Sequence, residues 1–168
     1  HHLMTHSSGI PEFADNPKAL DQSLKSIESR LQFAIDYCAG DFKFEPGTEF
    51  EYSNTGYYLL GVIVEKSTGR SLHENLKENI FEVAGMNDSG METEFEILPK
   101  LASGYVKGHT GQRKSRHENI EIAFSGGGMY STVEDFYSWD RALYGDKVLD
   151  KKTKKLVFSP HIPTDDYD

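Results

Sequence analysis

Residues 44–61 read FEPGTEFEYSNTGYYLLG, and this stretch combines a turn, a short extended run and the start of an apolar helix. Pro46-Gly47 is a turn dipeptide, because proline presets φ and glycine tolerates a positive φ. Residues 48–52 alternate large and charged side chains, which predicts a short half-buried strand. The next residues are apolar on almost every side, which predicts a buried helix over residues 55–67.

Tyr52 and Asn54 stand at the junction of this strand and helix, two positions apart. In an extended segment such residues project to the same side, so a phenol and a carboxamide should face one space with Ser53 turned away. A phenol can relay protons when neighbouring cations lower its pKa from about 10, and a carboxamide matches both faces of a substrate amide. Alternatively, Asn54 is only the N-cap of the helix, a position that asparagine favours.

Tyr-Ser-Asn at 52–54, between the Pro-Gly-Thr turn and Gly-Tyr-Tyr-Leu-Leu-Gly, resembles the middle motif of the serine β-lactamase and penicillin-binding-protein superfamily. Its nearest branch is similar to class C β-lactamases, with related esterases and D-amino-acid peptidases. The segment Leu3-Met4-Thr5-His6-Ser7-Ser8-Gly9 resembles the Leu-Leu-Thr-His-Thr-Ser-Gly segment of that superfamily. Further matches follow in order at residues 68–70, 81–86 and 126–135, so that the likeness runs to about Tyr144.

The resemblance implies a mostly helical α+β fold, the central portion of a β-lactamase-like domain. Residues 1–168 would be one unit, the helical lobe plus part of an α/β lobe, with a frayed tail at 159–168. It implies Tyr52 as the catalytic proton relay and Asn54 as a substrate-binding residue that holds the amide or orients a lysine. It implies no cofactor and no metal. A periplasmic, secreted or membrane-attached parent protein is the expectation from the superfamily.

Catalysis in this superfamily needs a serine three residues before a lysine, because that spacing places the amine beside the hydroxyl on a helix. No serine in the chain has lysine three positions later. Gly108-His109-Thr110-Gly111 and Lys152-Thr153-Lys154 do not supply the third motif, because the first lies too early and the second lacks its glycine. We therefore expect a central fragment of a serine acyl-transfer hydrolase that is inactive alone. The alternatives are a non-catalytic module binding peptidoglycan-like or peptide ligands, and a purely structural helical domain.

Two other patterns compete with this interpretation. Ser125-Gly126-Gly127-Gly128 precedes a helix and could cradle a phosphate, but it lacks a lysine, which favours a structural turn. His2 and His6 are four positions apart and could share a metal ion, but no third ligand has suitable spacing, which favours a packed or hydrogen-bonded histidine.

Composition limits the partners. Eighteen basic and twenty-seven acidic residues give a net charge of −9, which disfavours nucleic acid and anionic membrane surfaces. The single Cys38 excludes an internal disulfide. The sequence shows no apolar run of transmembrane length and no signal peptide. We expect a small-molecule or peptide substrate in the parent protein, a β-lactam, ester or D-amino peptide, and self-association of this chain through an exposed apolar face.

The remaining pattern predicts further elements along the chain. Apolar spacings of three and four predict one helix from Pro17 to about Tyr37, and residues 1–6 resemble a helix end. Phe136, Trp139 and Leu143 should form the inner face of a helix that begins at Ser131 or Thr132. Other expected elements are helices at 72–79 and 151–158 and strands at 101–107 and 120–124.

Overall fold

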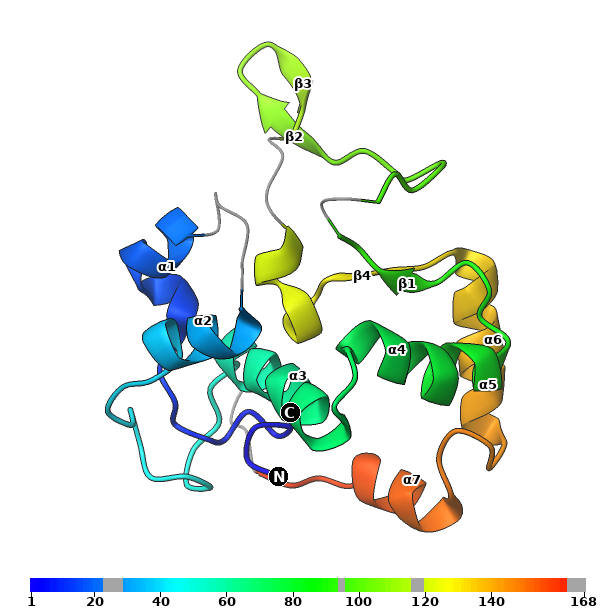
Figure 1. Ribbon diagram of the computed structural model, residues 1–168, viewed down its shortest axis with the longest axis horizontal. Helices are drawn as coiled ribbons and strands as arrows, with labels where there is room; N and C mark the ends of the chain where they lie inside the picture. Colours follow the sequence, from blue (N-terminus) through cyan, green and yellow to red (C-terminus); the bar gives the residue numbers. More distant parts are fainter. Residues whose placement is uncertain (23–28, 94–95, 116–119, 163–168) are drawn as a thin grey trace.

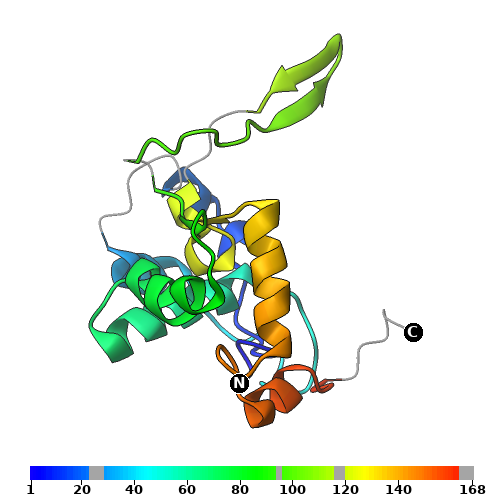
Figure 2. The same ribbon diagram turned by 90° about the vertical axis from the view of Figure 1, so that its right-hand side faces the viewer.

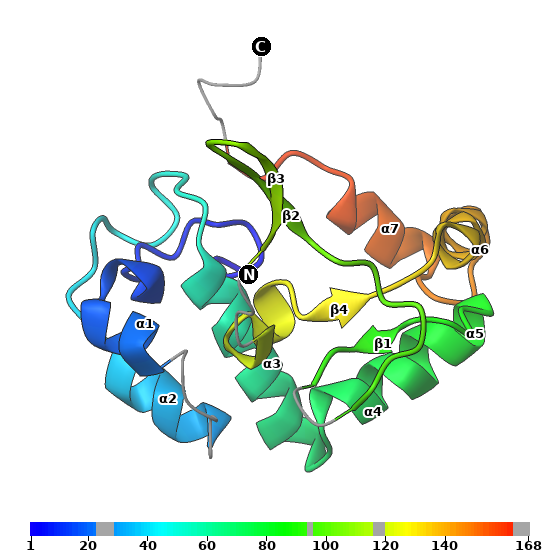
Figure 3. The ribbon, with the colours of Figure 1, turned by 90° about the horizontal axis from the view of Figure 1, so that it is seen from above.

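The computed structural model describes residues 1–22, 29–93, 96–115 and 120–162. Helices dominate these residues and the strands are short, which confirms the expected mostly helical α+β class. Helix α3 (Asn54–Thr68) runs through the middle of the molecule (Figure 1). On its two sides lie α1 (Pro17–Gln22) and α2 (Arg30–Tyr37), and α4 (Leu72–Leu76), α5 (Glu82–Ala84) and α6 (Val133–Tyr144), as Figure 3 shows. None of the described helices is long and apolar enough to cross a membrane.

Tyr58 of α3 is the centre of the core and is fully buried. The rings of Phe33, Phe124 and Phe13 pack against it, with centroids 5.1, 5.2 and 5.8 Å away. These rings come from α2 and from the 3-10 turns η4 (Phe124–Gly126) and η1 (Phe13–Asp15). Each such aromatic pair adds about 0.5–1.5 kcal/mol beyond the burial of area. The core therefore brings the N-terminal residues and the turn at Phe124 together on one helix.

The single helix expected from Pro17 to Tyr37 is wrong. Ser29 has an extended backbone, with φ of −147°, and its Oγ accepts the N–H of Gln32 at 3.2 Å. A serine cap therefore starts a second helix at Arg30, although the apolar spacing continues across it. The expected helical positions Leu24 and Ile27 lie outside the described residues.

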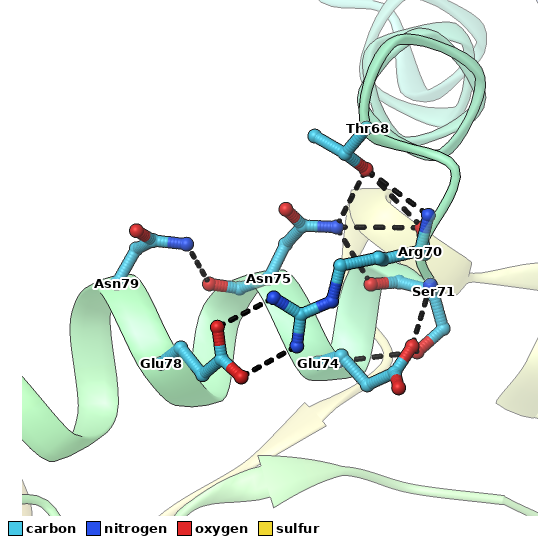
Figure 4. Close-up of polar contacts among 7 residues, drawn as sticks. All are labelled: Thr68, Arg70, Ser71, Glu74, Asn75, Glu78 and Asn79. Atoms are coloured by element: carbon cyan, nitrogen blue, oxygen red, sulfur yellow. Dashed lines mark hydrogen bonds and ion pairs between the residues drawn. The ribbon is translucent and has the colours of Figure 1, made fainter.

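The expected helix at 72–79 is confirmed and is longer than predicted. α4 continues through a π turn, η2 (Lys77–Phe81), into α5. Its start at Ser71 is a complete capping box with Glu74, and beside it Arg70 makes a bidentate ion pair with Glu78 at 2.5 and 2.6 Å (Figure 4). Asn75 Nδ2 donates to Thr68 Oγ1 at 2.9 Å and ties the end of α3 to this helix.

The strands differ most from expectation. β2 (Tyr105–Gly108) overlaps the predicted strand at 101–107, but its partner is β3 (Gly111–Lys114), where no strand was predicted. Residues 120–124 form the 3-10 turns η3 (Ile120–Ile122) and η4 instead of a strand. The β2–β3 hairpin extends away from the helices (Figure 2). A second pair, β1 (Gly90–Met91) with β4 (Met129–Tyr130), was not predicted.

α6 begins after Thr132, as predicted, because its Oγ1 accepts the N–H of Asp135 at 3.2 Å. The predicted inner face is partly wrong. Asp135 is buried, whereas Phe136 is 60% exposed. The expected helix near the end of the chain is confirmed as α7 (Lys151–Val157).

The stretch that precedes α3 contains the predicted turn but no strand. Gly47 has φ of +90°, which only glycine adopts easily. Residues 48–52 pair with no other strand and instead follow the N-terminal segment, with the N–H of Glu51 donating to His6 O at 2.9 Å. Residues 2–6 form turns and not the expected helix end. Two irregular segments therefore lie side by side at the start of α3.

Candidate active site

Tyr52 and Asn54 face one space, as their spacing predicts. The Tyr52 hydroxyl donates to Asn54 Oδ1 at 3.4 Å, and Tyr52 is 62% exposed. Ser53 between them is buried. A phenol and a carboxamide are therefore presented together to solvent at the first turn of α3, where both can contact a ligand.

Asn54 is not the N-cap of α3, so the capping alternative is wrong. Ser53 is the cap, and its Oγ accepts the N–H of Gly56 at 2.9 Å. The Asn54 N–H donates to Glu12 Oε2 at 2.6 Å, and the N–H of Thr55 reaches the same oxygen at 3.3 Å. Because Ser53 and Glu12 satisfy the free N–H groups of the first turn, the Asn54 side chain is available for a substrate.

His6 packs against the site from the N-terminal segment. The centroid of its ring lies 4.6 Å from that of Tyr52, with the planes tilted by 31°, and 5.0 Å from that of Tyr57, on which it stacks. Its Nδ1 accepts the N–H of Ser53 at 3.1 Å. Burial lowers the pKa of His6, which favours the neutral ring that this hydrogen bond needs. The expectation of a packed, hydrogen-bonded histidine is confirmed.

The glycine-rich segment closes one side of the site and is a structural turn. A Cβ on Gly61 of α3 would lie 2.2 Å from Ser125 Oγ and 2.4 Å from Phe124 Cε1, so the turn packs directly on the helix. Ser125 Oγ donates to the carbonyl of Tyr57 at 2.6 Å. Gly126 is in turn close to Asn54, whose Oδ1 would lie 3.9 Å from an added Cβ.

The other competing motifs lie away from Tyr52. The His109-Thr110 pair forms the tip of the β2–β3 hairpin, and Lys152-Thr153-Lys154 lies within α7. The His2 ring lies beside Gly47, where an added Cβ would be 3.1 Å from its Nε2, and its centroid is 5.9 Å from that of His1. In the described part of the chain no group of three or more His, Cys, Asp or Glu side chains is placed to hold a metal ion.

The sequence alone did not reveal how His6 and Glu12 serve the site. They are 47 and 42 positions from their partners Ser53 and Asn54, so no local period connects them. In the sequence, His6 stands out only within residues 3–9 and as a possible metal ligand with His2, and no motif or spacing points to Glu12. Each accepts a backbone N–H group at the start of α3, His6 that of Ser53 and Glu12 that of Asn54.

Comparison with known proteins finds relatives that match nearly the whole chain. The chain is 31% identical over 175 aligned residues to penicillin-binding protein 4* of Bacillus subtilis, covering 95% of this chain and 38% of that protein. It is 26% identical to a teichoic acid D-alanine hydrolase of Staphylococcus aureus, covering 95% of this chain and 36% of that one. The chain thus spans well under half the length of these relatives.

Solved structures show the same fold. A penicillin-binding protein from Bacillus halodurans superposes with a TM-score of 0.83 at 29% identity, covering 99% of this chain and 52% of that one. A D-amino acid amidase from Ochrobactrum anthropi gives a TM-score of 0.75 at 31% identity, covering 91% and 44%. The family model described as Beta-lactamase matches residues 1–166. This chain belongs to the beta-lactamase family of serine hydrolases and penicillin-binding proteins.

Proposed function

We propose that this chain is the central part of a serine acyl-transfer hydrolase, in which Tyr52 relays a proton and Asn54 holds the substrate amide. The observation that carries the proposal is the exposed Tyr52–Asn54 pair, with the two polar groups 3.4 Å apart and Asn54 free from capping. Membership of the family supports it.

The reaction needs a nucleophile that residues 1–168 do not supply as Ser-x-x-Lys. A serine oxygen from the remainder of the protein forms a bond to the substrate carbonyl carbon, and the carbonyl–nitrogen bond breaks. The serine proton reaches the leaving nitrogen through the Tyr52 phenol, while a lysine supplies the nearby positive charge. Water then cleaves the ester and restores the serine. Residues 1–168 alone are therefore inactive.

The substrate class is a small acyl compound with a D-amino acid part. The amidase from Ochrobactrum anthropi is by name a D-amino acid amidase, and the Staphylococcus relative a D-alanine hydrolase. The Asn54 carboxamide presents a donor and an acceptor to such an amide or ester. β-Lactams are the alternative substrates within the same chemistry.

The test uses the complete gene product with D-alanine amide, a D-alanyl ester and a β-lactam. Tyr52→Phe should lower kcat about 10²- to 10⁴-fold, the contribution of a positioned proton relay. Asn54→Ala should mainly raise KM. Tyr137→Phe is the matched control, because that tyrosine is 68% exposed and lies on α6. Full activity in Tyr52→Phe contradicts the proposal, and binding without turnover in the wild type favours the non-catalytic module.

We also propose that the isolated chain self-associates through α6 and its surroundings. Val133, Phe136, Tyr137 and Tyr144 are each at least 60% exposed. An adjoining open apolar pocket of about 470 Å³ is lined in part by Met129 and Trp139. Light scattering over a range of concentrations should show a mass that rises with concentration, and a constant monomer mass contradicts this proposal.

A further inference from the structure

Residues 6–9 contact the segment that leads into the candidate site, although they lie more than 30 positions before it in the sequence. Residues 6–9 follow residues 43–51 through three backbone hydrogen bonds of 2.7–2.9 Å, from Lys43, Gly47 and Glu51 to Gly9, Ser7 and His6. His6 stands at the end of this contact and has φ of +53°, a conformation that histidine adopts more readily than most residues. Its backbone and ring are thus both fixed by the segment that leads into α3.

The His6 ring makes two different kinds of contact. Its flat face packs against the Tyr52 phenol, with the centroids 4.6 Å apart and an angle of 31° between the planes. Its Nδ1 accepts the Ser53 N–H at 3.1 Å, which places the ring proton on Nε2. One contact sets the phenol ring, and the other sets the peptide plane between Tyr52 and Ser53.

From this geometry we infer that His6 is a positioning residue for the Tyr52–Asn54 pair. The inference rests on the proposed function of that pair. Because Asn54 follows Ser53 directly, rotation of the peptide that His6 holds would turn Tyr52 and Asn54 apart. His6 acts on the pair through its hydrogen bond to the Ser53 backbone and its ring contact with Tyr52. Misplacing a reacting group by about 1 Å can cost as much as 100-fold in rate.

Three variants separate the two contacts. His6→Ala removes both of them. His6→Asn keeps an oxygen near the position of Nδ1 and suits the positive φ, but it lacks the ring. His6→Phe keeps the ring and lacks the acceptor. His73→Asn is the matched control. His73 lies on α4, away from Tyr52, and its Nδ1 also accepts a backbone N–H, that of Met91 at 3.5 Å.

The first measurement needs no catalysis. NMR of the 168-residue chain with labelled tyrosine and asparagine should show cross-peaks between the Tyr52 ring and the Asn54 side-chain amide. They should be lost in His6→Ala, weakened in His6→Asn and His6→Phe, and unchanged in His73→Asn. Unchanged cross-peaks in all three His6 variants, with the chain still folded, overturn the inference. Loss in His6→Ala with full retention in the other two supports the inference and shows that either contact alone holds the pair.

The second measurement uses the complete gene product. His6→Ala should lower kcat/KM about 10- to 100-fold and mainly through kcat, with partial rescue by His6→Asn. If Tyr52→Phe abolishes turnover while His6→Ala changes neither turnover nor the cross-peaks, the positioning role fails and the proposed function stands. If His6→Ala removes the cross-peaks and neither variant affects turnover, His6 positions the pair and the proposed function fails.

Discussion

The carboxylate of Asp135 should be one of the largest single contributions to stability in this chain. It is buried, with 4% exposed, at the start of α6. It accepts hydrogen bonds from the N–H groups of Asn87 and Asp88, at 3.2 and 2.7 Å, and from Ser89 Oγ at 2.6 Å. One side chain thus closes the loop between α5 and β1 onto α6.

The magnitude follows from these three bonds. A hydrogen bond to a charged group contributes about 1.5–3 kcal/mol, and the 3.2 Å bond belongs at the low end. Asn87 and Asp88 are exposed, so in the variant water can accept the hydrogen bonds that their N–H groups no longer make to Asp135. Asp135→Ala should therefore lower the free energy of unfolding by about 3–5 kcal/mol. Asp135→Asn places an NH₂ group against at least one backbone N–H and should cost about 1–3 kcal/mol.

Urea unfolding followed by circular dichroism measures both variants, and the thermal midpoint should fall by about 6–20 °C for the alanine variant. Glu134→Ala is the matched control, because the neighbouring carboxylate is exposed and loses the same favourable charge at the helix N-terminus, about 0.3–1 kcal/mol. If Asp135→Ala costs no more than this control, the three hydrogen bonds do not stabilise the fold as reasoned.

Three further results are expected. Gly61→Ala should cost about 1–3 kcal/mol in urea unfolding, because its Cβ would lie 2.4 Å from Phe124, whereas Gly127→Ala, with 3.9 Å of space, should cost less; equal costs contradict the reasoning. Burial and a nearby carboxylate raise the pKa of Cys38 to about 12, so a thiol reagent at neutral pH should label it only on unfolding, and rapid labelling of folded protein refutes this. The pKa of His6 is lower in the folded chain than in the unfolded chain, because the ring is partly buried. As the pH falls below about 6.5, the unfolded chain therefore takes up a proton at His6 before the folded chain does. Stability should be full above that pH and fall as the pH drops through the lowered pKa, and the fall should shrink in His6→Asn.

The sequence predicted the parts of the site that depend on neighbouring residues. The two-residue spacing of Tyr52 and Asn54 placed both side chains on one side, and the buried Ser53 faces away as expected. Their chemical roles stay predictions. The alternative that made Asn54 the cap is wrong. Serine and asparagine both cap helices, and it is Ser53 that has the extended backbone of a cap, with φ of −139°.

The parts that failed depend on contacts distant in sequence or on weak local signals. Residues 48–52 alternate like a strand but have no strand partner, since the N-terminal segment beside them is a series of turns. The β3 strand contains glutamine, arginine and lysine and is exposed throughout, so that no apolar alternation marks it. In α6 the residue that the fold buries is charged, which an apolar pattern cannot reveal.

The hydrogen bond from Asn54 to Glu12 has a consequence for the order of folding. The first turn of α3 is completed by a carboxylate 42 residues earlier in the chain. Closing a loop of this length costs entropy before the contact forms, whereas a nucleated helix adds each residue within nanoseconds. The body of α3 should therefore form early, while its first turn stays frayed until the N-terminal segment arrives. The Tyr52–Asn54 pair is then assembled late in folding, so the geometry at this end of the helix reports whether the tertiary structure is complete.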